Sequence, residues 1–339
     1  MKIRPSTDCT YILPLRTSTS LCDSDLAQYL AWLAPQMDVI VVDGSPADVF
    51  AGHATAWGGI VRHVAPAADL ATSMGKVGGV LTGVRLATHE RLIIADDDVR
   101  YDEHGLGQVL GALDDADVVR PQNYFVPMPW HAAWDTGRTL LNRLSGGDWP
   151  GTLGVRRSVL LRTGGYDGTA MFENLELVRT IEAAGGRAVA PLDAYIARRP
   201  SGTHHFFSQR VRQAYDELAR PPRLAVQLAV LPLAVLGVVY KGWAALGVAA
   251  VVVIAFAEVG RRRAGGRRYF PARASLLAPA WVAERAVCSW LAVGARMLLG
   301  GVPYRGVVLH HAATPMRELR RRHAPAAVAP PRESRRRSA

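Results

Sequence analysis

The sequence predicts an α/β protein in which a mostly parallel sheet precedes a membrane-associated helical region. Through residues 8–220, short apolar segments alternate with segments of helical periodicity. This pattern is typical of a parallel sheet with helices on both faces. A long apolar stretch follows at 224–257, where Lys241 is the only charged residue. The basic residues are concentrated after it, because residues 261–339 hold 17 Arg and three acids, while the whole chain carries +11. A basic segment of this kind favours nucleic acid or an anionic membrane surface, and the apolar stretch beside it favours the membrane.

Five apolar segments are the expected strands. They are short, several are rich in β-branched residues, and turn residues follow them. Their ranges are 11–15, 37–45, 59–64, 91–95 and 117–121. The expected helices have apolar residues at helical spacing, and the first begins after the capping residue Ser24. Their ranges are 24–34, 75–88 and 171–187, the last with Glu173 in its first turn.

Residues 121–150 differ in composition, because they begin with a run rich in aromatic residues and Pro. One interpretation is a substrate-side loop followed by a helix from about Trp134. The other is a surface loop packed by its own aromatic side chains. Composition alone does not separate the two.

The long apolar stretch divides at Lys241 into two pieces, about 224–240 and 242–259. Each is about the minimum length for crossing a bilayer. A buried helical pair in a soluble core is the alternative, but the Arg residues on both sides favour a tight membrane hairpin with cytoplasmic flanks. Residues 278–301 predict a further amphipathic helix, either at the membrane interface or as a third crossing. Its charged residues would be costly in hydrocarbon.

The expected location is the cell membrane, as a multi-pass protein with residues 1–220 on the cytoplasmic side. The N-terminal residues contain no apolar segment long enough for a secretory signal. The three Cys residues have neither zinc spacing nor a disulfide pattern, which agrees with a reducing compartment.

Acidic residues follow two of the expected strands. Asp43 ends the second, and Asp96, Asp97 and Asp98 follow the fourth. Ligands bind beyond the carboxyl ends of parallel strands. Because alternate residues of an extended chain face the same way, Asp96 and Asp98 offer two carboxylates to a divalent ion such as Mg²⁺ or Mn²⁺. Solvated acidic turns are the alternative at both places.

Further candidates lie on expected helices. Lys76 follows Gly75 but belongs to no phosphate-binding loop of the Walker type. The helix dipole alone could explain Glu173, because acidic residues are favoured near the start of a helix. Gln209 and Arg212 are one helical turn apart and face the same way. Arg212 could hold a diphosphate bidentately, or the segment could contact lipid head groups.

The order of these features resembles one family. An Asp at the second strand end, an aspartate cluster at the fourth, an acid at a helix start and Gln-x-x-Arg before apolar helices are similar to the membrane-bound inverting glycosyltransferases of the family 2 type. That family includes cellulose synthase-like and ceramide glucosyltransferase-like enzymes. The resemblance covers roughly residues 8–310 and implies a GT-A nucleotide-diphospho-sugar transferase domain.

The resemblance also implies roles for individual residues. Nucleotide-sugar binding is expected of Asp43, Lys76, Asp96 and Asp97, metal binding of Asp96 and Asp98, and catalytic roles of Glu173, Gln209 and Arg212. The segment 300–306 is similar to a short basic and aromatic ending in lipid-glycosylating members.

Two departures from the family pattern affect these roles. Asn174 stands where the family usually has the Asp that acts as the base, and an amide cannot act as a carboxylate base. Glu173 is therefore the expected base. Gln213 replaces the usual Trp, which argues against a synthase of long polymers.

The implied function is inverting transfer of a sugar from a nucleotide-diphosphate sugar to a hydroxyl, with a membrane lipid or lipid-linked glycan as the expected acceptor. A divalent metal, Mg²⁺ or Mn²⁺, is the expected cofactor. A catalytically impaired sugar-nucleotide-binding membrane protein remains the alternative. A nucleotidyltransferase is disfavoured because the N-terminal segment lacks a Gly-rich phosphate loop, and nucleic acid is not an expected partner because no recognition module accompanies the Arg residues.

The predicted organisation has four parts. A cytoplasmic glycosyltransferase domain occupies 1–220 and a transmembrane hairpin occupies 221–260. A basic loop with the interfacial or third membrane helix occupies 261–310. A basic tail, expected to be disordered, occupies 311–339.

Overall fold

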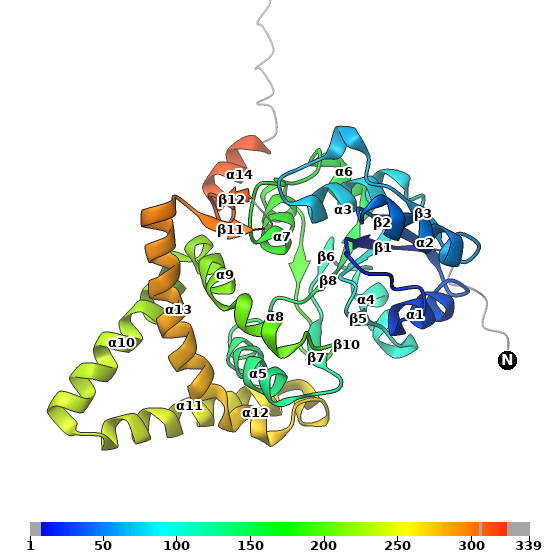
Figure 1. The fold of residues 1–339 in the computed structure, drawn as a ribbon. Helices are drawn as coiled ribbons and strands as arrows, with labels where there is room; N and C mark the ends of the chain where they lie inside the picture. Colours follow the sequence, from blue (N-terminus) through cyan, green and yellow to red (C-terminus); the bar gives the residue numbers. More distant parts are fainter. Residues whose placement is uncertain (1–7, 305–306, 324–339) are drawn as a thin grey trace, which may run out of the picture.

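The main sheet has seven strands in the order β3-β2-β1-β4-β8-β6-β9 (Figure 1). The computed structural model describes residues 8–304 and 307–323. All neighbouring strands of this sheet run parallel except β8, which is antiparallel to both β4 and β6. The mostly parallel sheet predicted from the sequence is therefore confirmed. The strands are β1 (Cys9–Leu15), β2 (Asp38–Asp43), β3 (Arg62–Val64), β4 (Arg91–Ala95), β6 (Val118–Val119), β8 (Thr152–Arg156) and β9 (Ala188–Val189).

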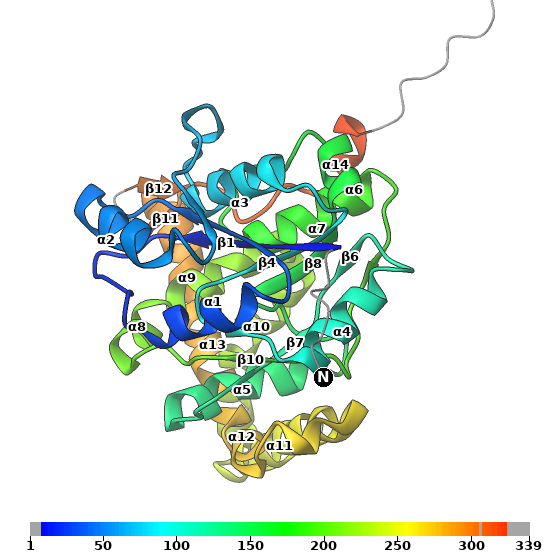
Figure 2. The same cartoon turned by 90° about the vertical axis from the view of Figure 1, so that its right-hand side faces the viewer.

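Helices cover both faces of this sheet (Figure 2). Alternate residues of β1 enter two cores: Tyr11 and Leu13 pack with one layer, and Ile12 packs with the other. Gly83 allows the second layer to approach closely, because a Cβ there would lie 2.4 Å from Cγ2 of Ile12. The first layer contains α1 (Asp25–Leu33), α2 (Ala47–Trp57) and α4 (Glu103–Ala112), and the second contains α3 (Gly75–Leu86), α6 (Arg157–Arg162) and α7 (Glu173–Ala183).

A second, three-stranded sheet includes a strand, β7 (Gln122–Phe125), in the segment 121–150 where the sequence predicted a loop. Its order is β5 (Val99–Arg100), β10 (Tyr195–Arg198), β7. The prediction for this segment was incomplete, because β7 pairs with a strand some 70 residues away, which local composition does not reveal. The helix expected from about Trp134 is α5 (Trp130–Asn142) and starts earlier, since Pro129 occupies its N-cap in an extended conformation.

Three long helices form the sides of an open triangle, which we call the helical frame (Figure 1). They are α10 (Pro221–Lys241), α11 (Ala244–Arg262) and α13 (Ala278–Leu299). Both expected apolar segments are helical, and the ranges Pro221–Lys241 and Ala244–Arg268 are long and apolar enough to cross a membrane. They diverge from the turn at Gly242, so they do not form the expected tight hairpin. At its far end α11 packs on α5, where a Cβ on Gly260 would lie 1.9 Å from the carbonyl oxygen of Leu140.

The amphipathic pattern expected of 278–301 is present in α13, but its polar stripe faces the protein. Arg285 is 2% exposed and Ser289 0%, whereas Met297 is 79% and Leu298 86% exposed. The Ser289 hydroxyl donates to Oε1 of Gln227 on α10 at 2.8 Å. The outward side of the frame is therefore apolar, the reverse of a helix on a water-soluble surface.

The described residues continue in an ordered fold beyond the expected start of the tail at 311. Residues 311–323 include α14 (Met316–Arg322), which packs on α7. The amide of Thr314 donates to Oε2 of the buried Glu176 at 2.6 Å, and this buried contact explains why the segment is ordered up to that point. Residues 324–339 of the expected disordered tail, and residues 305–306 of the segment 300–306, lie outside the described residues.

Candidate active site

A cavity of ≈ 760 Å³, the central cavity, separates the sheet from the helical frame. Its wall is formed by residues at the end of β4 and at the start of α7. Residues of α8 (Thr203–Ser208), of α9 (Arg210–Tyr215) and of the segment that leads from α9 to the frame complete it. Seven of the eight residues assigned roles from the sequence lie on its wall: Lys76, Asp96, Asp97, Asp98, Glu173, Gln209 and Arg212. The exception is Asp43.

The three aspartates occupy a turn after β4, and two of them share one arginine. Nε of Arg198 is 2.8 Å from Oδ2 of Asp98, and its Nη2 is 3.5 Å from Oδ2 of Asp96. Arg198 ends β10, so the small second sheet delivers this guanidinium to the aspartates. Asp97 lies on the wall of the same cavity. Burial raises the pKa of Asp97, and the neighbouring Asp96 raises it further.

Lys76, in the first turn of α3, joins the aspartates to α7. Its Nζ lies 2.5 Å from Oδ1 of Asp96 and 2.6 Å from Oε1 of Glu173. Burial alone would lower the pKa of Lys76, but the two carboxylates outweigh it and raise the pKa above its usual range. Three segments distant in the sequence thus meet at one ammonium group.

The aspartates fit a divalent cation by their chemistry. Oδ1 of Asp98 is buried and has no hydrogen-bond partner among the described residues. Gly151 leaves the other side open, because a Cβ there would lie 2.8 Å from Oδ2 of Asp96. Carboxylate oxygens are the ligands that hard divalent ions prefer. In the structure described here, the cations that balance these carboxylates are the side chains of Lys76 and Arg198.

A second cavity of ≈ 440 Å³, the side cavity, adjoins the central one and shares Lys76, Asp96 and Asp97 with it. It lies over the carboxyl ends of β1 and β2, which is where ligands bind in open parallel sheets. Its walls include Leu15, Gly44 and residues 71–73.

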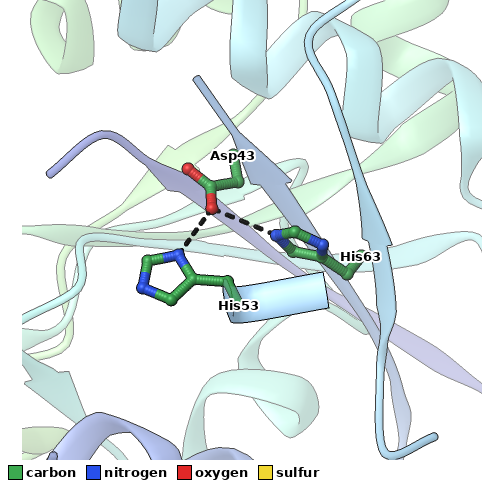
Figure 3. Close-up of side chains that lie close together, drawn as sticks. All are labelled: Asp43, His53 and His63. Atoms are coloured by element: carbon green, nitrogen blue, oxygen red, sulfur yellow. Dashed lines mark hydrogen bonds and ion pairs between the residues drawn. The ribbon is translucent and has the colours of Figure 1, made fainter. Parts of the chain in front are cut away.

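Asp43 points away from both cavities, into a buried cluster with two histidines (Figure 3). Its Oδ2 is 2.7 Å from Nδ1 of His53 and 3.1 Å from Nε2 of His63, and its Oδ1 accepts the amide of Ser45 at 2.9 Å. Burial alone would raise the pKa of Asp43, but these hydrogen bonds from Ser45 and the two histidines outweigh it and hold the pKa below its usual value. Direct contact of Asp43 with a nucleotide stays a prediction, while its visible contacts fix the turn that carries Gly44.

The Asp43 cluster has the residue types of a metal site, and its three candidate ligand atoms lie within 4.8 Å of one another. One hydrogen bond argues against a metal there. The amide of Leu21 donates to Nε2 of His53 at 3.0 Å, so in a neutral ring the proton of His53 is on Nδ1 and points at Asp43. That nitrogen then has no lone pair for a metal, and the cluster is best described as a hydrogen-bonded unit that sequence spacing did not reveal.

The segment carrying Gln209 and Arg212 also lines the central cavity. The side chain of Gln209 donates to the Ser208 hydroxyl at 3.3 Å. The amide of Asn174 donates to the carbonyl of Pro150 at 3.0 Å, so this side chain braces the wall. Sequence reasoning missed further charged residues of this cavity, among them Arg198, Asp216 and Arg285. For Asp216 the sequence offered one signal, because this residue is one helical turn after Arg212.

Comparisons with known proteins give one informative structure. No family model and no curated protein sequence matches the chain. The mannosyltransferase PcManGT from Pyrobaculum calidifontis, solved in complex with GDP-Man and Mn²⁺, is similar over 85% of this chain and 88% of its own, with a TM-score of 0.53 and 19% identity. TarS from S. aureus is more distant: one structure has a TM-score of 0.41 and 15% identity over 62% of this chain and 40% of its own. A second, TarS 1–349 in complex with UDP, has a TM-score of 0.40 and 16% identity over 61% of this chain and 64% of its own. The chain therefore has a glycosyltransferase fold built on a mostly parallel sheet.

Proposed function

We propose that this protein is an inverting glycosyltransferase that moves a sugar from a nucleotide-diphosphate sugar to a hydroxyl of a membrane lipid or lipid-linked glycan. The observation that carries the proposal is the meeting of Asp96, Asp98, Lys76, Glu173 and Arg212 on one cavity wall. The similarity in fold to PcManGT, whose structure contains GDP-Man and Mn²⁺, supports a nucleotide-sugar donor.

The donor would lie across the two cavities, with its nucleoside in the side cavity and its sugar in the central one. A divalent ion held by Asp96 and Asp98 would offset the negative charge of the diphosphate. Arg212 lies on the wall of the same cavity and can pair with phosphate oxygens bidentately. Such fixed charges stabilise the leaving diphosphate as the bond to the sugar breaks.

The acceptor hydroxyl must lose its proton during the attack, and this requires a base facing the central cavity. Several carboxyl groups on the cavity wall outside the aspartate turn are not bonded to Arg198. Asp148 and Glu217 are paired with other arginines, which leaves Glu173, which the sequence predicted, and Asp216 as the candidates. Attack from the face opposite the leaving group inverts the anomeric centre.

A lipid acceptor is favoured by the surroundings of the cavity. The segment 209–220 leads directly into α10, whose 18-residue apolar window is 0% buried. The outward residues of α13 are apolar as well. A helical frame embedded in one or both leaflets would hold the cavity at the membrane surface, with the sheet in the cytoplasm.

The proposal is tested with purified protein in detergent, radiolabelled UDP- and GDP-sugars, Mn²⁺ or Mg²⁺, and a bacterial membrane lipid extract. We expect transfer of label into the chloroform-soluble fraction with one donor class, and loss of this transfer with EDTA. The proposal would be refuted if the protein neither transferred sugar from any of these donors nor bound any of them.

A catalytically impaired donor-binding protein is the second candidate, and Asn174 in place of the usual acid favours it. It predicts a thermal shift with UDP or GDP and Mn²⁺ but no transfer above background. It also predicts that Glu173→Gln leaves this background unchanged.

A further inference from the structure

Asp216 is a carboxyl group of the central cavity whose function the proposal above leaves open. It begins the 3-10 helix Asp216–Ala219, directly after α9. It lies on the cavity wall with Glu173, and its Oδ1 is buried without a hydrogen-bond partner among the described residues. A buried carboxylate oxygen without a partner is costly unless a ligand supplies the missing hydrogen bond.

The backbone around Asp216 is firmly anchored, so the carboxyl group has a defined position. The preceding Tyr215 is 0% exposed, and its hydroxyl donates to the carbonyl of His310 at 2.9 Å. The following Glu217 accepts a hydrogen bond from Arg220 at 2.9 Å. α9 also packs along α13. A side chain on such a support can keep an acceptor in place without large rearrangement.

The charges around Asp216 suit proton transfer near neutral pH. Burial raises the pKa of Asp216 to about 7, even though Arg212, Arg220 and Arg285 oppose the rise; Glu173 adds to it. These four groups face it from α9, from the end of the 3-10 helix, from α13 and from α7. A base with a pKa near the working pH is both deprotonated often enough and basic enough to act.

Glu173 and Asn174, the other candidates at this wall, are engaged elsewhere. Oε1 of Glu173 is 2.6 Å from Nζ of Lys76, so this carboxylate already has an ion-pair partner. Asn174 has no basic oxygen and donates to Pro150. Two carboxyl groups in one cavity with different surroundings are suited to different roles.

We propose that Asp216 is the general base of the transfer, and that Glu173 positions Lys76 and the aspartates. This inference rests on the proposed glycosyltransferase function. In the reacting complex, the acceptor hydroxyl oxygen forms a bond to the anomeric carbon and its proton passes to the Asp216 carboxylate. The bond between the anomeric carbon and the diphosphate oxygen breaks, and the nucleoside diphosphate leaves with that electron pair.

The test compares pH profiles of four variants with octyl β-D-glucopyranoside as the hydroxyl acceptor. Asp216→Asn should lower kcat by roughly 10²–10⁴-fold while donor binding changes little. In the wild type, kcat should fall as the pH drops below about 7, and this acidic limb should be absent from the residual activity of Asp216→Asn. Asp216→Glu should retain it. The exposed Asp115→Asn serves as the matched control and should behave as the wild type.

Dodecyl phosphate supplies a second arm, because an ionised phosphate acceptor needs no base. With this acceptor, Asp216→Asn and the wild type should react at similar rates. An acidic limb that persists in Asp216→Asn, or that disappears in Glu173→Gln instead, would overturn the assignment while leaving glycosyl transfer intact.

A measurement without turnover separates the two proposals further. In protein with ¹³C-labelled Asp carboxyl groups, the signal missing from Asp216→Asn should titrate near pH 7. A midpoint below about 5, close to an ordinary Asp, would exclude Asp216 as the base whatever the activity. Absence of transfer to either acceptor, with a normal midpoint, would instead count against the proposed function.

Discussion

The sheet and the helical frame bury opposite kinds of side chain. In the sheet, apolar residues fill two cores, while ion pairs such as Arg85–Asp69 lie at the surface. In the frame, Arg285 and Ser289 are buried and the outward residues of α10 and α13 are apolar. The difference is the one expected of the proposed membrane contact, because apolar side chains turn away from water and toward lipid. The central cavity lies where the two regions meet; most of its acids come from the sheet side, and Arg285 comes from α13 of the frame.

The largest effect is expected where charges are buried against the frame. Arg210 lies 2.9 Å from both Asp135 on α5 and Glu284 on α13, and its side chain is 4% exposed. Arg210→Met leaves Glu284 without this ion pair and leaves Asp135 with Arg138 as its remaining partner, and breaking buried pairs of this kind costs about 3–5 kcal/mol. Urea unfolding in detergent measures the loss. Arg85→Met, which removes the exposed pair with Asp69, is the matched control and should leave the midpoint unchanged; similar midpoints for both variants would contradict the contrast between the regions.

The next effect concerns the acids on the sheet side. Asp98→Asn removes one of the two carboxylates that face Arg198 and fit a divalent ion. We expect transfer to fall about 10²–10³-fold, the range for losing one group that stabilises developing charge. The thermal shift produced by UDP or GDP should also lose its dependence on Mn²⁺. Asp115→Asn should preserve both properties, and an unchanged metal dependence in Asp98→Asn would place the ion elsewhere.

A smaller effect tests the packing between the sheet and its helices. Gly83→Ala would place a Cβ 2.4 Å from Cγ2 of Ile12, at the contact of α3 with β1. Overpacking of this kind costs about 1–3 kcal/mol. Gly107→Ala on α4 is the control, because its Cβ would meet nothing within 4 Å, and it should stabilise the protein by about 0.5–1 kcal/mol. Equal destabilisation by both substitutions would mean that α3 does not lie this close to the sheet.

Sequence patterns predicted five of the seven strands of the main sheet because these patterns are local, whereas β8 and β9 were not predicted. The β-branched run that becomes β2 and the Ser24 cap of α1 need no knowledge of distant contacts. Lys76 and Glu173 were proposed as site residues only because of their place in the order of motifs along the chain. The ion pair between them was found only in the three-dimensional structure. β7 and Arg198 were missed because they depend on pairing across some 70 residues.

The frame shows the other limit of sequence reasoning. The polar stripe of α13 was recognised, but which way it faces depends on Gln227 and on the cavity behind Arg285. Asp43 shows the same limit inside the sheet: its position at the end of β2 was predicted, but its direction depends on His53 and His63, which come from α2 and β3. Position along an element follows from local pattern, whereas the direction of a polar side chain follows from its partners.

The smallest effect on stability, and the most direct test of the two environments, comes from valines in two helices. Val239 on α10 is 70% exposed, whereas Val84 on α3 is 2% exposed. Val239→Ser should change the free energy of unfolding in detergent by no more than about 0.5 kcal/mol, as for other surface sites. Val84→Ser should cost at least about 2 kcal/mol, because it removes buried apolar area and adds a hydroxyl to a core.

The substitution with the smaller effect on stability should have the larger effect on membrane binding. Flotation with phosphatidylglycerol vesicles measures binding, and Val239→Ser combined with Leu298→Ser should weaken it, since both side chains lie on the outward face of the frame. Val84→Ser, in whatever fraction remains folded, should bind as the wild type does. If the double variant binds unchanged, the apolar face of the frame is covered by protein rather than lipid, and the contrast between the two regions has a different cause.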